Sequence, residues 1–255
     1  MKMTKQNATS VALVTGATSG IGVEIARRLI QDGLHVLITG RSEERGRRVA
    51  DELGERCRFI RADLNQPGAA DKLIEATLAE WGRLDVLVNN AAIDHTNDLL
   101  AVGEEEIRST FETNTFAPMN LLIAAARTMK TQGEGGSIIN ITSRLASIGV
   151  PTMGVYSASK GAMLAFTKAA AIDLAPENIR VNAVAPGMTR TPLYQQWLDS
   201  LPDPEGEAER VASAIPLGRI AESNDVASVV SFLASPDNSY LTGISIPVDG
   251  GYLAK

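Results

Sequence analysis

Short apolar runs alternate with longer segments of helical periodicity along the whole 255-residue chain. Each run has the length of a buried strand, and the segment that follows it is long enough for a helix. Neighbouring parallel strands need such helical crossovers, so the alternation predicts a mostly parallel, doubly wound α/β sheet with helices on both faces. The seven expected strands cover residues 11–14, 35–39, 58–62, 84–88, 137–141, 180–184 and 244–248.

The alternation runs from residue 9 to residue 255 without an internal repeat, a low-complexity stretch or a linker. We therefore expect a single domain over residues 9–255, preceded by a disordered tail of residues 1–8. Segment 188–216 is longer than a usual connection and contains prolines beside Leu193, Tyr194 and Trp197. Long connections of this kind are usually binding loops or lids, so we predict a substrate-binding lid there. A surface insertion whose aromatic side chains cover the core is the alternative.

The composition excludes several classes of function. A net charge of -6 and a pI of about 5.1 argue against a nucleic-acid partner, because a phosphate backbone needs a basic face. No apolar stretch approaches the roughly 18 residues of a membrane span, and no apolar segment follows the first lysines, so a cytoplasmic location is expected. Cys57 is the only cysteine, and His35 and His95 are the only histidines, which leaves too few ligands for a usual zinc site. We expect Cys57 to be a packed thiol.

The first apolar run leads into a glycine-rich turn, Thr15-Gly16-Ala17-Thr18-Ser19-Gly20-Ile21-Gly22. A helical pattern follows over residues 20–31, and Gly33 is a natural stop for that helix. Strand, glycine turn and helix in this order are typical of a site for a nucleotide phosphate, where glycines allow a tight turn and close approach of the backbone to a pyrophosphate. An ordinary glycine-rich turn is the alternative.

Tyr156 and Lys160 are four residues apart, and Ser143 lies thirteen residues before Tyr156 at the end of an expected strand. On a helix this spacing places both side chains on one face, so the ammonium of Lys160 should favour ionisation of the phenol and lower its pKa. The three side chains indicate proton-transfer chemistry. A tyrosine packed on a lysine stem, together with a structural serine, is the alternative.

In combination, these motifs resemble those of the short-chain dehydrogenase/reductase family, and the resemblance extends over nearly the whole chain. The family usually has a glycine at position 92, where this chain has Ala92, and the added methyl group puts the exact shape of that loop in question. The matching positions are Thr15 to Gly22, Asp63, Asn89 to Ala91, Asn114, Ser143, Tyr156, Lys160, Asn182, Pro186, Gly187 and Val248 to Gly251.

The resemblance implies a Rossmann-type oxidoreductase that moves a hydride between a nicotinamide cofactor and a small carbonyl or secondary alcohol substrate. It gives Tyr156 the role of general acid and base, Ser143 that of orienting the substrate oxygen, and Lys160 that of holding the ribose and tuning the phenol. Asn114 is expected to hold a water in a proton relay. The implied cofactor-binding residues are Gly16, Ser19, Gly20, Ile21, Gly22, Arg41, Ser42, Asp63, Leu64, Asn90, Tyr156, Lys160, Pro186, Gly187 and Thr191.

Several bland or rival interpretations accompany this assignment. Asp63 and Asn90 are also suited to capping turns, and a plain polar surface residue is the alternative for Asn114. His95 could line the substrate pocket, but a solvent-exposed loop is expected. Arg144 could pair with an acidic substrate group or lie on a solvated turn. A sugar-nucleotide epimerase or dehydratase is opposed by the glycine spacing and the short C-terminal region. A dinucleotide-sensing regulatory protein is opposed by the complete set of serine, tyrosine and lysine.

The end of the second expected strand bears on the choice between NADP and NAD. An acidic residue there would bind the ribose hydroxyls of NAD and repel a 2′-phosphate, but the chain has Gly40 followed by Arg41 and Ser42. A guanidinium suits a phosphate, so NADP is predicted, with NAD as the alternative. Glu43 and Glu44 lie close by and oppose this choice, and a solvated residue at the start of the next helix is the alternative for Arg41.

The helix expected over residues 157–174 is apolar on most of its circumference. A helix of this kind is buried on most sides, so one face should meet the sheet and another should meet a partner subunit. The family resemblance suggests a homotetramer.

Overall fold

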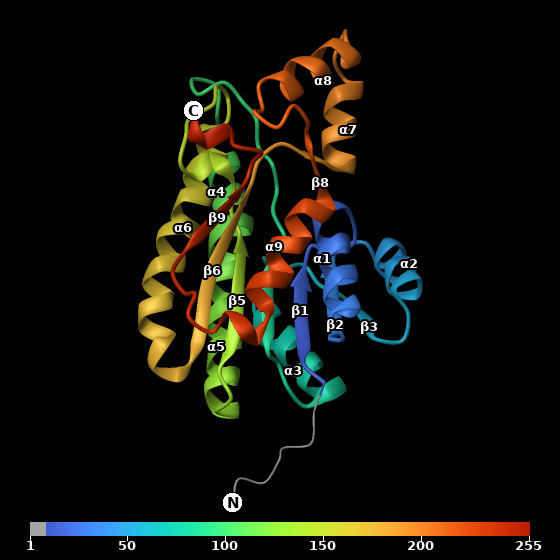
Figure 1. Ribbon diagram of the computed structural model, residues 1–255, viewed down its shortest axis with the longest axis vertical. Helices are drawn as coiled ribbons and strands as arrows, with labels where there is room; N and C mark the ends of the chain where they lie inside the picture. Colours follow the sequence, from blue (N-terminus) through green and yellow to red (C-terminus); the bar gives the residue numbers. More distant parts are fainter. Residues whose placement is uncertain (1–8) are drawn as a thin grey trace, which may run out of the picture.

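The computed structural model describes residues 9–255 and contains a seven-stranded parallel sheet flanked by helices (Figure 1). The strand order is β3-β2-β1-β4-β5-β6-β9, and every neighbouring pair is parallel. The predicted doubly wound α/β fold is therefore confirmed. The seven strands are β1 Val11–Thr15, β2 His35–Gly40, β3 Cys57–Arg61, β4 Val86–Asn89, β5 Gly136–Ile141, β6 Ile179–Pro186 and β9 Ser245–Val248.

The connections are helical, as the alternation of the sequence predicts. Short 3-10 helices cover Arg144–Ala146, Ala175–Glu177, Pro236–Asn238 and Tyr252–Ala254. The α-helices are α1 Gly20–Gln31, α2 Glu43–Leu53, α3 Ala69–Trp81, α4 Glu104–Phe111, α5 Ala117–Gln132, α6 Gly154–Leu174, α7 Pro192–Asp199, α8 Pro204–Ser213 and α9 Ser223–Ala234.

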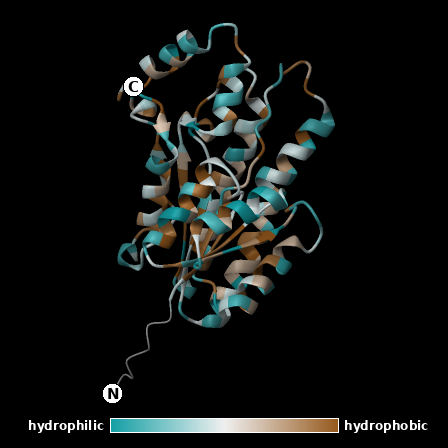
Figure 2. Cartoon of the chain, turned by 90° about the vertical axis from the view of Figure 1, so that its right-hand side faces the viewer, coloured by the Kyte–Doolittle hydropathy of each residue, from teal (hydrophilic) through white to brown (hydrophobic). Residues whose placement is uncertain are grey.

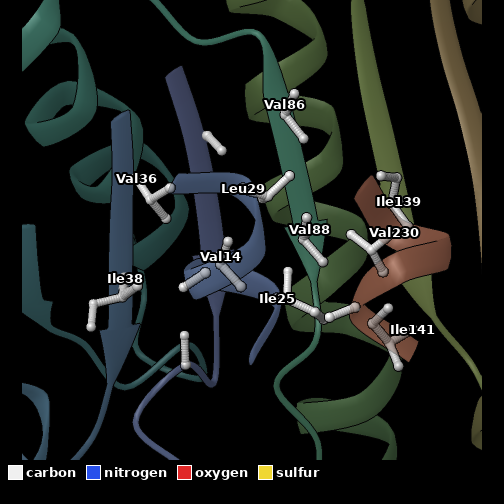
Figure 3. Packing of buried hydrophobic residues seen from close by; sticks show 14 of the residues in the cluster. Val14, Ile25, Leu29, Val36, Ile38, Val86, Val88, Ile139, Ile141 and Val230 are labelled. Atoms are coloured by element: carbon white, nitrogen blue, oxygen red, sulfur yellow. The ribbon is translucent and has the colours of Figure 1, made fainter. Parts of the chain in front are cut away.

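Alternating side chains of the strands pack into two hydrophobic cores, one on each face of the sheet. Val14 packs with α1, α2 and α9, and its neighbour Leu13 packs with α3, α5 and α6 on the opposite face. Figure 3 shows the first core, in which Ile25 and Leu29 of α1 and Val230 of α9 meet strand residues. Figure 2 shows apolar strands between helices in which hydrophilic and hydrophobic residues alternate. Burial on both faces explains why each strand is an almost continuous apolar run.

The strand order reverses between β1 and β4, and ligands of open α/β sheets bind at such a switch point, beyond the carboxyl ends of the strands. The glycine turn follows β1 at this place, and Asn90 follows β4. The two are joined by hydrogen bonds, since the backbone N–H of Asn90 donates to Thr15 Oγ1 at 3.0 Å and its Nδ2 donates to the Thr15 carbonyl at 2.9 Å. The fold thus brings two of the predicted motifs together.

Two regions near the carboxyl edge of the sheet are irregular. The helical segment around Asn114 is interrupted, because residues Glu112–Phe116 form a π-helical turn between α4 and α5. Segment 188–216 consists largely of helices α7 and α8, which stand beyond the carboxyl ends of the strands (Figure 1). They are anchored by a small core of Tyr194, Leu198, Ile215 and Ile220, and by short parallel strands β7 Thr189–Arg190 and β8 Ala221–Glu222.

The disordered tail predicted for residues 1–8 lies outside the described residues. Cys57 is buried and free, as expected, and burial raises the pKa of its thiol to about 12. Over residues 9–255, none of the helices combines the length and apolar character that crossing a bilayer requires.

Candidate active site

The turn after β1 depends on glycine at two of its positions for reasons of space. Gly16 has a φ of +64°, and a Cβ at this position would lie 2.7 Å from the Cα of Ala91. A Cβ at Gly22 would lie 2.5 Å from the carbonyl oxygen of Gly16. Side chains are therefore excluded where the backbone of the turn meets helix α1 and the end of β4, which is the function of glycine in a dinucleotide-binding turn.

The N-terminus of α1 is suited to an anion. Ser19 occupies the N-cap position in an extended conformation, but its side chain makes no capping hydrogen bond, and the first turn of the helix has no acidic residue. The backbone N–H groups at Gly20 and Ile21 therefore lack an intrahelical or side-chain partner, and the helix dipole favours negative charge beside them. Thr191 lies close to this turn, since its Cγ2 would be 3.4 Å from a Cβ on Gly20.

The end of β2 has no room for an acidic side chain. A Cβ on Gly40 would lie 2.6 Å from Cγ2 of Thr18, so glycine is the residue that fits there. Arg41, the next residue, is exposed, and its guanidinium has no ion pair or hydrogen bond within residues 9–255. Of the two acids that might neutralise it, Glu43 is already paired with Arg47 at 2.6 Å. Ser42 caps α2, and its Oγ accepts a hydrogen bond from the backbone N–H of Arg45.

The other predicted cofactor residues lie at the same edge of the sheet. Asp63 and Leu64 follow β3, and Pro186 and Gly187 end and follow β6. Asp63 Oδ1 accepts from the Asn65 backbone at 3.1 Å, and Asn90 Nδ2 donates to the Gly16 carbonyl at 3.2 Å. Both side chains therefore stabilise turns, which is the alternative role that the sequence suggests for them. A turn-closing role is compatible with lining a cleft.

Ala92 fits the loop in which the family usually has glycine. The residue is exposed, and the only described non-glycine residues with a positive φ are Thr152 and Asn178. Ala92 therefore has a negative φ, which alanine adopts without strain, so glycine is not required at this position. The substitution therefore leaves the path of the loop intact.

Helix α6 carries Tyr156 in its first turn and Lys160 one turn later. Lys160 is only 3% exposed, and its Nζ donates to the carbonyl of Ile141 at 3.0 Å, 5.7 Å from the centroid of the Tyr156 ring. Burial lowers the pKa of Lys160 to about 8, although the negative charge of Asp94 acts in the opposite direction. The ammonium thus lies at the carboxyl end of β5, beneath the phenol.

The sequence predicts a lowered pKa for Tyr156, and this prediction is wrong: the groups of the protein itself raise that pKa. The pKa of this half-buried phenol is raised to about 12, chiefly by burial and also by the charge of Asp94, while hydrogen bonding by Ser143 acts against both. The ammonium of Lys160 is held by the Ile141 carbonyl and does not offset these effects. At neutral pH the phenol is therefore protonated and can serve as a proton donor.

Ser143 follows β5 directly, so its hydroxyl stands at the carboxyl edge of the sheet. Its Oγ accepts from the backbone N–H of Leu145 at 3.1 Å. Because a hydroxyl both donates and accepts, its hydrogen remains available for an oxygen at the site. The Ser143 hydroxyl also lowers the pKa of the Tyr156 phenol through hydrogen bonding, so the two predicted side chains lie close together.

Asn114 lies in the π-helical turn and is almost completely buried. Its Oδ1 accepts from the backbone N–H of Ile93 at 2.8 Å, and its Nδ2 donates to the Ile93 carbonyl at 2.9 Å and to Ser159 Oγ at 3.2 Å. These are the competing hydrogen bonds that an asparagine within a helical stretch signals. Pro118 cannot donate to the backbone carbonyl of Asn114 four residues earlier, which explains why the helix is irregular here.

Sequence reasoning missed several side chains around the site. Asp94 acts electrostatically on Tyr156 and Lys160, and its place shortly after Asn90 was the only available signal. His95 is not simply solvent-exposed, because it is half-buried and its Nε2 lies 2.8 Å from Glu106 Oε1. Arg144 differs too from the expected solvated residue.

The guanidinium of Arg144 stacks on Tyr252, with Cζ 4.0 Å from the ring centroid. Tyr252 in turn packs on the small core that anchors α7 and α8. The C-terminal residues thus connect the turn after Ser143 with the segment beyond the sheet edge.

A sheet switch point, a helix N-terminus suited to an anion and a serine–tyrosine–lysine cluster are together typical of a dinucleotide-dependent oxidoreductase. Comparisons with known proteins agree. A family model described as enoyl-(acyl carrier protein) reductase matches residues 16–253. A diacetyl reductase of Staphylococcus epidermidis is 35% identical over 253 residues, which cover 96% of this chain and 98% of the relative.

Two further relatives extend the comparison to a dehydrogenase and to a solved structure. The NADP-dependent (R)-specific alcohol dehydrogenase of Lentilactobacillus kefiri is 36% identical over 259 residues, 99% of this chain and 100% of the relative. A solved structure of ElxO with NADP bound has 31% identity and a TM-score of 0.90, and covers 97% of this chain and 100% of its own. The chain belongs to the short-chain dehydrogenase/reductase family and is an oxidoreductase of the NAD(P)-dependent type that acts on carbonyl or alcohol groups.

Proposed function

We propose that the protein is an NADP-dependent carbonyl reductase or secondary alcohol dehydrogenase in which Tyr156 transfers the proton. The observation that carries this proposal is the meeting of Tyr156 and Ser143 at the carboxyl edge of the sheet, with Lys160 buried beneath them. These are the groups required to hold an oxygen and to move a proton to or from it.

Each side chain has a task that follows from its surroundings. The nicotinamide cofactor, when bound, supplies or accepts the hydride. Ser143 donates a hydrogen bond to the substrate oxygen, and the protonated phenol of Tyr156 gives its proton to the same oxygen in the direction of reduction. Lys160 provides a positive charge next to the phenol. The carbonyl of Asn114, which has no partner four residues on, is suited to hold the water of a relay.

Cofactor choice rests on the corner between β2 and α2. The unpaired guanidinium of Arg41 and the hydroxyl hydrogen of Ser42 suit a 2′-phosphate, whereas Gly40 leaves no carboxylate for the ribose hydroxyls of NAD. The alcohol dehydrogenase from Lentilactobacillus kefiri is NADP-dependent, and solved structures of ElxO and of a variant of actinorhodin polyketide ketoreductase hold NADP or NADPH. NAD is the alternative that this corner disfavours.

The proposal also covers the domain organisation, the substrate lid and the oligomeric state. We propose that residues 9–255 form a single domain and that segment 188–216 is its substrate-binding lid. Leu193 and Trp197 support a lid, because both remain exposed although they are large and apolar. A homotetramer is supported by exposed apolar side chains on helical surfaces, among them Phe116, Ile172 and Phe232.

Kinetics with NADPH and NADH test this proposal. We expect a higher kcat/KM with NADPH, and Arg41→Ala should weaken the reaction with NADPH by about 1.5–3 kcal/mol, roughly ten- to hundredfold, with a much smaller effect on NADH. Arg127→Ala, which removes an exposed arginine on α5, is the matched control and should change neither. Equal kinetics with both cofactors in the unmodified enzyme would refute the NADP assignment, and binding of NADPH without turnover of any carbonyl would favour a dinucleotide sensor.

A further inference from the structure

The loop that follows Asn90 is held from several sides. Both backbone groups of Ile93 are bound by the side chain of Asn114. His95 is held by Glu106, and the backbone N–H of Asn97 donates to the carbonyl of Thr152 at 3.0 Å. The residue between Ile93 and His95 is therefore fixed in position, although it is itself exposed.

That residue is Asp94. Within residues 9–255 its carboxylate has no side-chain hydrogen-bond partner, and it accepts only from the backbone N–H of His95. The negative charge of Asp94 interacts electrostatically with Tyr156 and Lys160 of α6. In its own loop, it interacts in this way only with His95. Asn114, which binds Ile93, also donates to Ser159 Oγ at 3.2 Å, so this loop is tied to the helix that carries Tyr156. An accessible carboxylate is thus held on a loop joined to α6, where its charge acts on the phenol.

We infer that Asp94 selects substrates, accepting a hydrogen bond from a hydroxyl group on the carbon next to the reacting carbonyl and disfavouring a carboxylate at the same place. The inference deepens the proposed function and rests on it. Hydrogen bonds to an ionised acceptor are among the stronger ones, and a site that provides a polar partner discriminates against analogues that leave it unpaired. A substrate carboxylate would instead meet a like charge.

The same placement extends the pH range over which the phenol can donate a proton. The charge of Asp94 raises the pKa of Tyr156, so the phenol stays protonated to higher pH and remains a proton donor. The same charge partly offsets the lowering of the Lys160 pKa, and the pKa of Asp94 itself is raised chiefly by desolvation of its carboxyl group. Removing the negative charge should therefore move the alkaline limb of the pH profile for reduction to lower pH.

Matched ketones test the selection directly. Hydroxyacetone and 2-butanone differ only by a hydroxyl group in place of a methyl group, and 2-hydroxyacetophenone and propiophenone form the same pair on a larger frame. Pyruvate carries a carboxylate at this place. In the unmodified enzyme we expect kcat/KM to favour the hydroxyketone of a pair by about tenfold or more, with pyruvate disfavoured. In Asp94→Ala the preference should fall to within about threefold while reduction of the plain ketone is retained.

Asp94→Asn keeps the size of the side chain and removes its charge, so it should improve pyruvate reduction and shift the alkaline limb downward. Asp98→Asn changes a charge of the same loop that does not act on Tyr156, and it should leave both measurements unchanged. NADPH binding by fluorescence reports whether each variant is folded. A hydroxyketone preference that survives in both Asp94 variants, or an unmoved alkaline limb in Asp94→Asn, would overturn the role of Asp94 and leave the proposed function standing. Absence of NADPH oxidation with every ketone in the unmodified enzyme would overturn both.

Discussion

Replacing Lys160 by methionine should stabilise the folded protein at neutral pH and at the same time abolish turnover. Lys160 is 3% exposed, and burial lowers its pKa from 10.5 to about 8. A lysine whose pKa is lower in the folded state destabilises the fold wherever it is charged, because the unfolded chain binds the proton more tightly. Stability should therefore rise as pH increases from about 8 to about 10.5.

The size of the effect follows from this pKa difference. At pH 7 the charged lysine costs the fold about 3 kcal/mol relative to a neutral side chain, and at pH 10 the cost falls below about 1 kcal/mol. Methionine removes this cost, but it also removes the hydrogen bond from Nζ to the Ile141 carbonyl, a loss of about 1 kcal/mol. The variant should gain about 2 kcal/mol at pH 7 and almost nothing at pH 10.

Urea unfolding of both proteins at pH 7 and pH 10, at one fixed protein concentration, measures this difference. The raised pKa values of Cys57 and Tyr156 lower stability at high pH in both proteins, so they largely cancel in the comparison. Lys168→Met, at an exposed position of the same helix, is the control and should show little change at either pH. A Lys160→Met protein that is less stable at pH 7, or a difference that is the same at both pH values, would refute the reasoning.

Three further predictions concern the site and the assembly. Tyr156→Phe should bind NADPH with little change, as measured by fluorescence titration, but lose turnover by about 10²- to 10⁴-fold; near-normal turnover would show that the phenol is not the proton donor. Gly22→Ala should destabilise the turn by about 1–3 kcal/mol and weaken NADPH binding, since the new Cβ would lie 2.5 Å from the Gly16 carbonyl oxygen, and an unchanged Kd would contradict this. Light scattering at micromolar concentration should report a tetramer, and a stable monomer would contradict the proposed assembly.

The strands could be predicted from the sequence because each one is buried on both faces and therefore forms a short, continuous apolar run. The observed ends of the strands differ from the predicted ends by up to two residues, because strand ends depend on individual hydrogen bonds. Helices α7 and α8 were missed, although Thr191-Pro192 and Asp203-Pro204 are both N-cap residues followed by proline. Such pairs are a recognised helix start, but each helix buries too few side chains to give a clear periodicity.

In the candidate site, the sequence predicts where the residues lie but not their pKa values. Ser143, Tyr156 and Lys160 could be placed because strand ends and helical spacing determine where such residues lie. The pKa of Tyr156 could not be predicted, because it depends on burial, on the direction of the Lys160 ammonium and on Asp94, which is distant in sequence. The π-helical turn at Asn114 has a signal in Pro118, four residues later, because proline has no N–H to donate to the Asn114 carbonyl.

Because Thr18 lies against Gly40, the residue at position 18 limits which residue fits at position 40. An aspartate introduced at position 40 alone would begin 2.6 Å from the Thr18 methyl group, so its first effect would be a steric clash in the glycine turn. Thr18→Gly removes the obstructing side chain and is the step that has to come first. Redesign toward NAD, and sequence drift in the same direction, therefore follow an order in which a substitution at position 18 opens the way for an acid at position 40.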